Sequence, residues 1–328
     1  MTEIPAASII KVIAIVAGFV FVYLLRDVLM VVFFAIIISS AVAPFADWLE
    51  SKKIPRILSV LVLYLIVAAL GILLLTILIP VTAYELRQLI QILPKLFSDA
   101  SIALENIPSM QGLLDSASQF LQVSSQSSIG IVISVFGGLI SFLSIIIISF
   151  YFSIMRHGIP SFLRSVLPDR YEGYAIGLWR RSELKVGRWF QGQLLLGLAM
   201  GLFVFVGLSL MGVKYALLLG ILAMVLELVP IAGPVLASIP AIILAFLQSR
   251  GLGFAVVIFY IIAQQTENHF LAPVILGKST GLNPVTVIIA LLIGAKLAGI
   301  LGILLAVPVA VVIVEVLDDM AEQRRKPT

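Results

Sequence analysis

The sequence predicts an all-α, polytopic integral membrane protein with about eight transmembrane helices, of which the C-terminal ones are broken or re-entrant. Hydrophobic residue types make up 61% of its 328 residues, and charged types make up only 12%. The mean hydropathy is +1.19. Soluble domains are about 45–50% apolar and about 25% charged, so a soluble chain of this composition could not cover its surface with polar groups. The composition therefore excludes an ordinary soluble enzyme, a disordered chain and a nucleic-acid-binding domain.

The N-terminal unit, residues 1–81, is predicted to contain three spans, and a fourth span follows after a polar segment. A helix needs about 20 predominantly apolar residues to cross the hydrocarbon core of a bilayer. Apolar stretches of this kind cover residues 9–25, 28–46, 57–81 and 129–155. Only Arg26 and Asp27 separate the first two stretches, which predicts a tight hairpin between them.

Two polar segments predict how the chain is oriented in the membrane. The segment 82–128 contains two Lys or Arg residues, whereas the segment 156–193 contains seven. Because cytoplasmic loops carry an excess of Lys and Arg, we expect 156–193 in the cytoplasm and 82–128, a helical insert, outside it. The N-terminus and the basic tail, residues 317–328, are then cytoplasmic as well, which requires an even number of crossings.

The basic segment 156–193 also has the pattern of a helix that lies in the plane of the lipid headgroups. Arg181, Lys185 and Arg188 share one helical face, while Trp179 and Trp189 lie toward the other side. Such a helix would turn its basic residues toward lipid phosphates and its indole rings into the interface. The alternative, which is the more common case, is a simple positive-inside anchor that has no role with the substrate.

The C-terminal transport core, residues 194–316, is apolar almost throughout but is repeatedly interrupted. Several of its apolar pieces have only about 10–14 residues, which is the length expected of half-helices and re-entrant segments. The pieces cover residues 194–211, 215–228, 235–247, 253–262, 285–293 and 297–316. Their assignment to individual crossings stays open at the level of the sequence.

Two interruptions of this core contain the polar residues that are candidates for a transport site. Ionisable groups within membrane segments are energetically expensive and are therefore functional candidates by default. Helices broken by Pro and Gly are the best sequence pointer to a transporter's binding site. The candidates for binding a substrate or an ion are Glu227, Pro230, Gly233, Pro234, Gln265, Glu267, Asn268, Asn283 and Pro284. The alternatives are that Glu227 only faces water at the interface and that residues 264–269 form an ordinary loop.

Small residues recur in the last apolar piece and in the fifth predicted span. Ala295, Gly299, Gly302 and Ala306 follow one another at spacings that predict a single small-residue face along one helix. Gly197 begins a GxxxG pattern in the fifth span. Small faces let helices approach closely in lipid, so tight packing within the protomer is the preferred interpretation and a pore lining is the alternative.

Recognisable enzyme, metal and cofactor motifs are not found in the sequence. The chain has no Cys and only two His residues, so we expect no metal site, no cofactor and no catalytic set. Residues 277–279 resemble the end of a phosphate-binding loop, but the first glycine of that motif would fall on Ala272. Nucleotide binding is therefore not expected, and the protein is not predicted to be an enzyme.

Short motifs with a specific order and spacing suggest a family. These are APFADWLE at 43–50, IPR at 54–56, ELVPIAGP at 227–234 with PA at 240–241, QTEN at 265–268, Pro273, GK at 277–278, LNP at 282–284, GILG at 299–302 and AVP at 306–308. Together with the layout of apolar segments, they make the chain resemble the autoinducer-2 exporter-like (AI-2E) family of bacterial and archaeal membrane proteins along most of its length. One departure is Asn283, where the family often has His. Because Asn cannot titrate, a proton-coupling role at that position is not expected here.

The resemblance implies an eight-helix transporter in the plasma membrane of a bacterium or archaeon, forming homo-oligomers with the pentamer as the expected state. It implies export of a small polar signalling molecule in some members and exchange of Na⁺ or related cations for protons in others. Our hypothesis is thus a secondary transporter whose partners are the lipid bilayer and a small polar solute or a cation and proton, with no nucleic acid. A passive channel or pore is the alternative, and a membrane enzyme or scaffold is a weaker one.

Overall fold

The computed structural model describes residues 17–18, 20–21, 23–73, 76, 80, 128–155, 158–277 and 281–325, with side chains left out for 128–139 and 322–325. Within these ranges all regular elements are helices, which confirms the all-α class. The elements are α2 (Arg26–Ser51), the helix Arg56–Leu73, α5 (Ser128–Ile154), α6 (Gly158–Val166), α7 (Asp169–Leu210), α8 (Ala216–Leu226), α9 (Ala232–Gln248), α10 (Arg250–Thr266), the π-helix η1 (Glu267–Leu271), α11 (Ala272–Ile275) and α12 (Pro284–Arg325). The predicted segment 82–128, except its last residue, and most of the first predicted span lie outside the described residues.

Four of the described helices are long and apolar enough to cross a membrane, or five if the bent pair formed by α5 and α6 counts as one span. The four are α2, the helix Arg56–Leu73, α7 and α12. The short apolar helices α8 and α9 are the interrupted pieces that the sequence predicts for the C-terminal core. The polytopic membrane architecture is therefore confirmed, while the number of eight crossings stays a prediction.

The tight hairpin predicted at Arg26 and Asp27 is not formed. The Leu25 amide donates to the Phe21 carbonyl, and the Leu29 amide donates to the Leu25 carbonyl. These are helix-type bonds, so the chain continues through Leu25 without reversing. The pair contains neither Pro nor Gly, and a long Arg side chain can extend its charge toward water without interrupting a helix.

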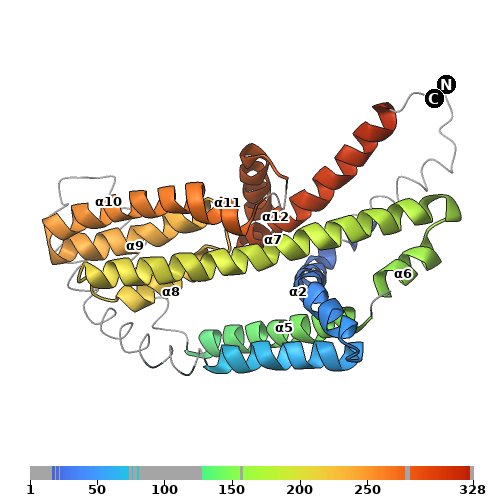
Figure 1. Cartoon of the computed structure of the whole chain (residues 1–328), viewed down its shortest axis with the longest axis horizontal. Helices are drawn as coiled ribbons and strands as arrows, with labels where there is room; N and C mark the ends of the chain where they lie inside the picture. The colour runs from blue at the N-terminus through green and yellow to red at the C-terminus, as the bar shows by residue number, and fades with distance from the viewer. Residues whose placement is uncertain are drawn as a thin grey trace.

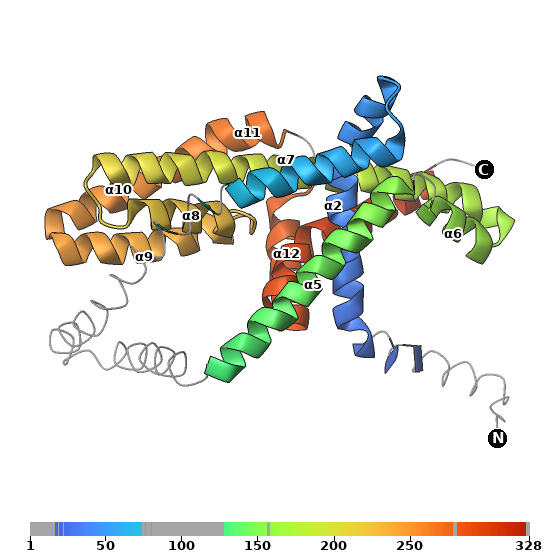
Figure 2. The same ribbon diagram turned by 90° about the horizontal axis from the view of Figure 1, so that it is seen from below.

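The axis of the molecule is α7, a single helix of 42 residues and about 63 Å. Figure 1 shows α8, α9 and α10 packed beside one half of α7, with α2, α5 and α6 near the other half. Viewed from below, α2 and α5 cross under α7, near the place where α12 also meets it (Figure 2). The basic segment therefore continues directly into the predicted fifth span, because nothing between Arg188 and Leu194 breaks the helix.

The prediction that the basic segment forms a helix in the plane of the lipid headgroups is therefore wrong for Trp189, Arg181 and Lys185. Trp189 is only 5% exposed and packs in a core with residues of α2 and α12. The Arg181 guanidinium forms ion pairs with Glu315 and Asp319 of α12, and the Lys185 ammonium pairs with Glu315. Acidic residues of α12, rather than lipid phosphates, thus neutralise two of the three basic residues.

The four-helix unit formed by α8, α9, α10 and the C-terminal half of α7 is held together by small residues. At Gly201 on α7, an added Cβ atom would lie 2.6 Å from the Met224 Cβ atom and 2.9 Å from the Gly220 carbonyl oxygen of α8. On α9, small residues at four-residue spacing are fully or almost fully buried, namely Ala237, Ala241 and Ala245. The GxxxG pattern of the fifth span is therefore a helix-packing face, as preferred.

The small-residue stripe of the last apolar piece is not one helical face. Ala298 and Gly299 have non-helical backbone angles, and Gly299 has a φ of 59°. An added Cβ atom at Gly302 would lie 2.0 Å from the Gly294 carbonyl oxygen, so the segments on either side of the break lie against each other. α12 is thus a hairpin of two arms (Figure 1). Gly299 tolerates the positive φ at the break, and Gly294 and Gly302 allow the two arms to come into close contact.

Candidate functional site

The first interruption of the core is a tight reversal between α8 and α9. The Leu228 and Val229 amides donate to carbonyls three residues back, which tightens the end of α8. Pro230 cannot continue the helix, and the Ala232 amide donates to the Pro230 carbonyl at 2.7 Å. This closes a γ-turn centred on Ile231, whose φ is 69°. A γ-turn with positive φ is rare and strained, especially for a β-branched residue.

The strain at Ile231 gives a test of the turn. We expect Ile231→Gly to raise the free energy of unfolding by about 1 kcal/mol, because relief of the positive φ exceeds the entropy cost of Gly. Little packing is lost, since the Ile231 side chain is 46% exposed. Thermal unfolding of the purified protein in detergent measures the change. Leu228→Gly, in the same turn with ordinary backbone angles, is the control and should destabilise; a loss of stability from Ile231→Gly as well would contradict the strained turn.

Gly233 and Pro234 complete this reversal and are both buried. An added Cβ atom at Gly233 would lie 2.0 Å from the Leu226 carbonyl oxygen, so the start of α9 can lie against the end of α8 only if this residue is Gly. Pro234 falls in the first turn of α9, where its missing N–H removes no helical hydrogen bond. Gly233 and Pro234 are thus covered by protein, whereas Ile231 is exposed, so the prediction that the whole first break faces the protein interior stays a prediction.

Glu267 begins the π-helix η1, at the end of α10. A π-helical turn carries one extra residue and is frequently found at functional sites. The Gln264 side-chain amide donates to the Glu267 Oε2 atom at 3.2 Å and lies 3.4 Å from the Asn268 Oδ1 atom. The polar run 264–269 is thus part of a helix, rather than the ordinary loop of the alternative interpretation.

The tertiary structure brings Glu227 and Glu267 together. Their carboxyl groups interact directly with each other, although the residues are far apart in the sequence. Glu227 is 2% exposed and Glu267 is 6% exposed, which contradicts the alternative that Glu227 only faces water. Two adjacent carboxylates repel each other when both are ionised, so a proton on one of the two groups stabilises the pair. None of the ion pairs among the described residues involves either carboxyl group.

Gln193 of α7 contacts Glu227, one member of this carboxyl pair. Its side-chain amide donates to the Glu227 backbone carbonyl, while its Oε1 atom is buried and has no hydrogen-bond partner among the described residues. One turn further along α7, an added Cβ atom at Gly197 would lie 3.4 Å from the Glu227 Cβ atom, so this Gly leaves room for the Glu227 side chain. Gln193 thus contacts the backbone of Glu227 and has a buried side-chain oxygen that is free to accept a hydrogen bond.

Gln193 and Gln264 were not among the residues predicted from the sequence. A signal for Gln193 was present, because it is a polar residue in a helix that is apolar from there to its end. Tyr260 lies on the same helical face as Gln264 and Glu267, and its Oη atom is buried without a hydrogen-bond partner among the described residues. Among the described residues, no group of three or more His, Asp or Glu side chains could hold a metal ion.

The other candidates lie outside this buried cluster. Gln265 and Asn268 are exposed. Asn283 is exposed and caps α12, because its Oδ1 atom accepts from the Val285 amide at 2.9 Å, and Pro284 takes the first helical position.

The residues that flank the second break on both sides are exposed. Pro273 and Gly277 precede it, and Asn283 and Pro284 follow it; all four are exposed. The prediction that this break faces the interior is therefore wrong for the chain by itself, because residues with a capping role need solvent or polar surroundings rather than burial. Residues 278–280, within the GK motif and its continuation, lie outside the described residues.

Apolar spans, broken helices and a buried carboxyl pair together define a membrane transporter. The sequence model of the AI-2E family transporters matches residues 9–322, and the chain belongs to this family. The resemblance seen in the sequence motifs is thereby confirmed.

Relatives of this chain are found in Bacillus subtilis and Escherichia coli. YueF of Bacillus subtilis (strain 168) is 29% identical over 283 residues, which cover 81% of this chain and 77% of YueF. YrrI of the same organism is 28% identical over 85% of this chain and 82% of its own length. YhhT of Escherichia coli (strain K12) is 26% identical over 86% of this chain and 80% of its own length. All three are named for transport, and none of these names gives a substrate.

Proposed function

We propose that this protein is a secondary transporter that exchanges a monovalent cation for a proton at the Glu227–Glu267 pair. The observation that carries the proposal is that two buried carboxyl groups lie against each other with no basic partner among the described residues. Carboxyl groups within membrane segments are the usual elements of proton relays and ion paths. The pair also lies beside the α8–α9 reversal and η1, which are both irregular backbone segments.

The chemistry of the exchange follows from competition for one site. Two ionised carboxylates at hydrogen-bond distance repel each other, and either a proton or a bound cation relieves that repulsion. A cation that enters between Glu227 and Glu267 displaces the proton of the pair, and the returning proton displaces the cation. The Gln193 Oε1 atom supplies a neutral oxygen ligand, and oxygen ligands are those that hard cations prefer.

Export of a small polar solute uses the same proton site in a different way. There, the proton bound at the pair would drive the solute, and the solute would occupy a separate place in the core. A passive channel differs from both, because it moves its substrate only down that substrate's own gradient.

The three possibilities are separated by flux measurements in proteoliposomes. Vesicles with an acidic interior and a trapped pH-sensitive dye are diluted into Na⁺, Li⁺ or K⁺ solutions, with protein-free vesicles as the control. Cation–proton exchange predicts that adding the cation outside makes the interior alkaline, and that a pH gradient drives cation uptake against its own gradient. A second arm replaces the cation by labelled autoinducer-2. Flux that never runs against the substrate's own concentration gradient, and that does not respond to the pH gradient, would instead establish a channel.

A further inference from the structure

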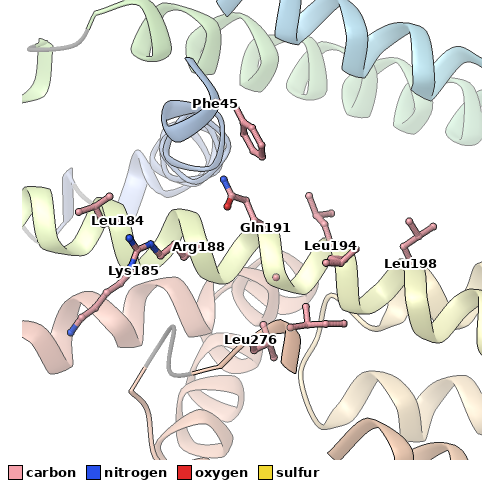
Figure 3. A pocket seen from close by; sticks show the side chains of 11 residues that line it. Phe45, Leu184, Lys185, Arg188, Gln191, Leu194, Leu198 and Leu276 are labelled. Atoms are coloured by element: carbon pink, nitrogen blue, oxygen red, sulfur yellow. The ribbon is translucent and has the colours of Figure 1, made fainter. Parts of the chain in front are cut away.

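A groove of about 990 Å³ runs along one side of α7. We call it the α7 groove. Its walls come from α7, from Phe45 of α2, and from Ile275 and Leu276 at the end of α11. Figure 3 shows Phe45 extending from α2 toward α7, with Leu194 and Leu198 further along α7. The groove is separate from the carboxyl pair, which lies where α7 meets α8 and η1.

One end of the α7 groove is positively charged. Arg188 and Lys185 line this end, and none of the residues that line the groove is acidic. Lys185 is already neutralised by Glu315 of α12. Arg188 is exposed and forms no ion pair with any residue that the structure describes, so it supplies one uncompensated positive charge at the mouth of the groove.

Apart from Gln191, whose side-chain amide donates to the Ala41 carbonyl, the rest of the α7 groove is lined by residues without polar side chains. Phe45, Leu194, Leu195 and Leu198 are each about half exposed, at 49% to 54%. From Arg188 to Leu198 the helix rises about 15 Å over ten residues. One leaflet accounts for half of a hydrocarbon core of about 30 Å, so the apolar wall below Arg188 matches the length of an acyl chain in one leaflet.

We propose that the α7 groove binds an anionic phospholipid, with the lipid phosphate at Arg188 and an acyl chain along Phe45, Leu194, Leu195 and Leu198. The positive charge selects an anionic headgroup, and the apolar wall selects a lipid over a free phosphate. Basic pockets between transmembrane helices on the cytoplasmic side are suited to anionic headgroups, and the positive-inside pattern predicts that side for Arg188. The lipid would lie between α2, α7 and the end of α11.

Lipid retention measured by native mass spectrometry tests the site without any transport assay. The full-length protein in detergent is titrated with dioleoyl phosphatidylglycerol or dioleoyl phosphatidylcholine, with and without excess inorganic phosphate. We expect tighter binding of phosphatidylglycerol, and no displacement of it by inorganic phosphate. Arg188→Gln should weaken phosphatidylglycerol binding by about fivefold to tenfold. Arg170→Gln is the matched control, since Arg170 is an exposed Arg on the same helix but outside the groove.

A second variant tests the apolar wall. Leu198→Trp fills the acyl slot, keeps Arg188, and changes a side chain that is 54% exposed, so the fold should tolerate it. It is expected to reduce the binding of both lipids. The proposal is overturned if Arg188→Gln binds phosphatidylglycerol as the wild type does, or if inorganic phosphate displaces the lipid. It is also overturned if Leu198→Trp leaves lipid binding unchanged but splits an oligomer, because a second copy of the chain would then occupy the groove.

Discussion

Replacement of either buried carboxyl group, as Glu227→Gln or Glu267→Gln, is expected to reduce proton-coupled flux to the level of protein-free vesicles. The amide keeps the shape of the side chain and can still hydrogen-bond to the remaining carboxyl group, so folding should be preserved. It cannot release a proton or carry the charge that a cation needs. The measurement is flux against pH for each variant and for the double variant, at matched amounts of reconstituted protein.

The pH dependence distinguishes loss of coupling from loss of expression or folding. Competition between proton and cation predicts that wild-type exchange is greatest at intermediate pH and falls on both sides. The variants should show no pH-dependent component at all. Glu172→Gln is the control, because Glu172 is a surface partner of Arg164 and lies outside the cluster. If both single variants and the double variant transport like the wild type across the pH range, the coupling site lies elsewhere.

The second large effect is expected for Gly302→Ala in the α12 hairpin. The added Cβ atom would lie 2.0 Å from the Gly294 carbonyl oxygen, which belongs to the backbone and cannot move aside. Overpacking of a well-packed contact costs about 1–3 kcal/mol and occasionally more, and we expect a loss of roughly 3 kcal/mol in unfolding free energy. Gly294→Ala should act similarly, since its Cβ atom would lie 2.3 Å from the Gly302 carbonyl oxygen.

Thermal unfolding in detergent, followed by circular dichroism, measures this loss. Gly173→Ala on α7 is the matched control, because its added Cβ atom meets no heavy atom within 4 Å. The control should be neutral or slightly stabilising, since Ala favours a helix over Gly by about 0.5–1 kcal/mol. Equal stability of Gly302→Ala and Gly173→Ala would mean that the two arms of α12 are not in close contact.

The membrane class and the two interruptions of the C-terminal core that contain Pro and Gly, at 230–234 and 273–284, could be predicted from the sequence. These features depend on local chemistry: a run of apolar residues forms a helix in lipid, and Pro230 with Gly233 must interrupt it whatever surrounds it. The same local argument identified Glu227 and Glu267 as costly residues that need a reason to be buried.

Local chemistry also suggested features that the structure does not have in three places. It favoured a hairpin at Arg26 and Asp27, where the helix continues, and it allowed a separate interfacial helix in the basic segment beside the more common anchor, where α7 runs on unbroken. It treated the stripe that includes Gly299 and Gly302 as one helical face, although the chain reverses within it. In each case the periodicity was present, but periodicity does not reveal whether the helix bends or what packs against it.

The helical membrane class, the interruptions at 230–234 and 273–284 and the unusual carboxyl groups Glu227 and Glu267 follow from the sequence alone. The packing of the helices was needed to show that Glu227 and Glu267 contact each other, that Gln193 donates to the Glu227 backbone carbonyl, and that Arg188 forms no ion pair with any described residue while Lys185 pairs with Glu315. The physical reason is the range of the interactions. Hydropathy and backbone propensity act between near neighbours, whereas a carboxyl pair and an ion pair join residues that only the packing of separate helices brings within hydrogen-bond distance.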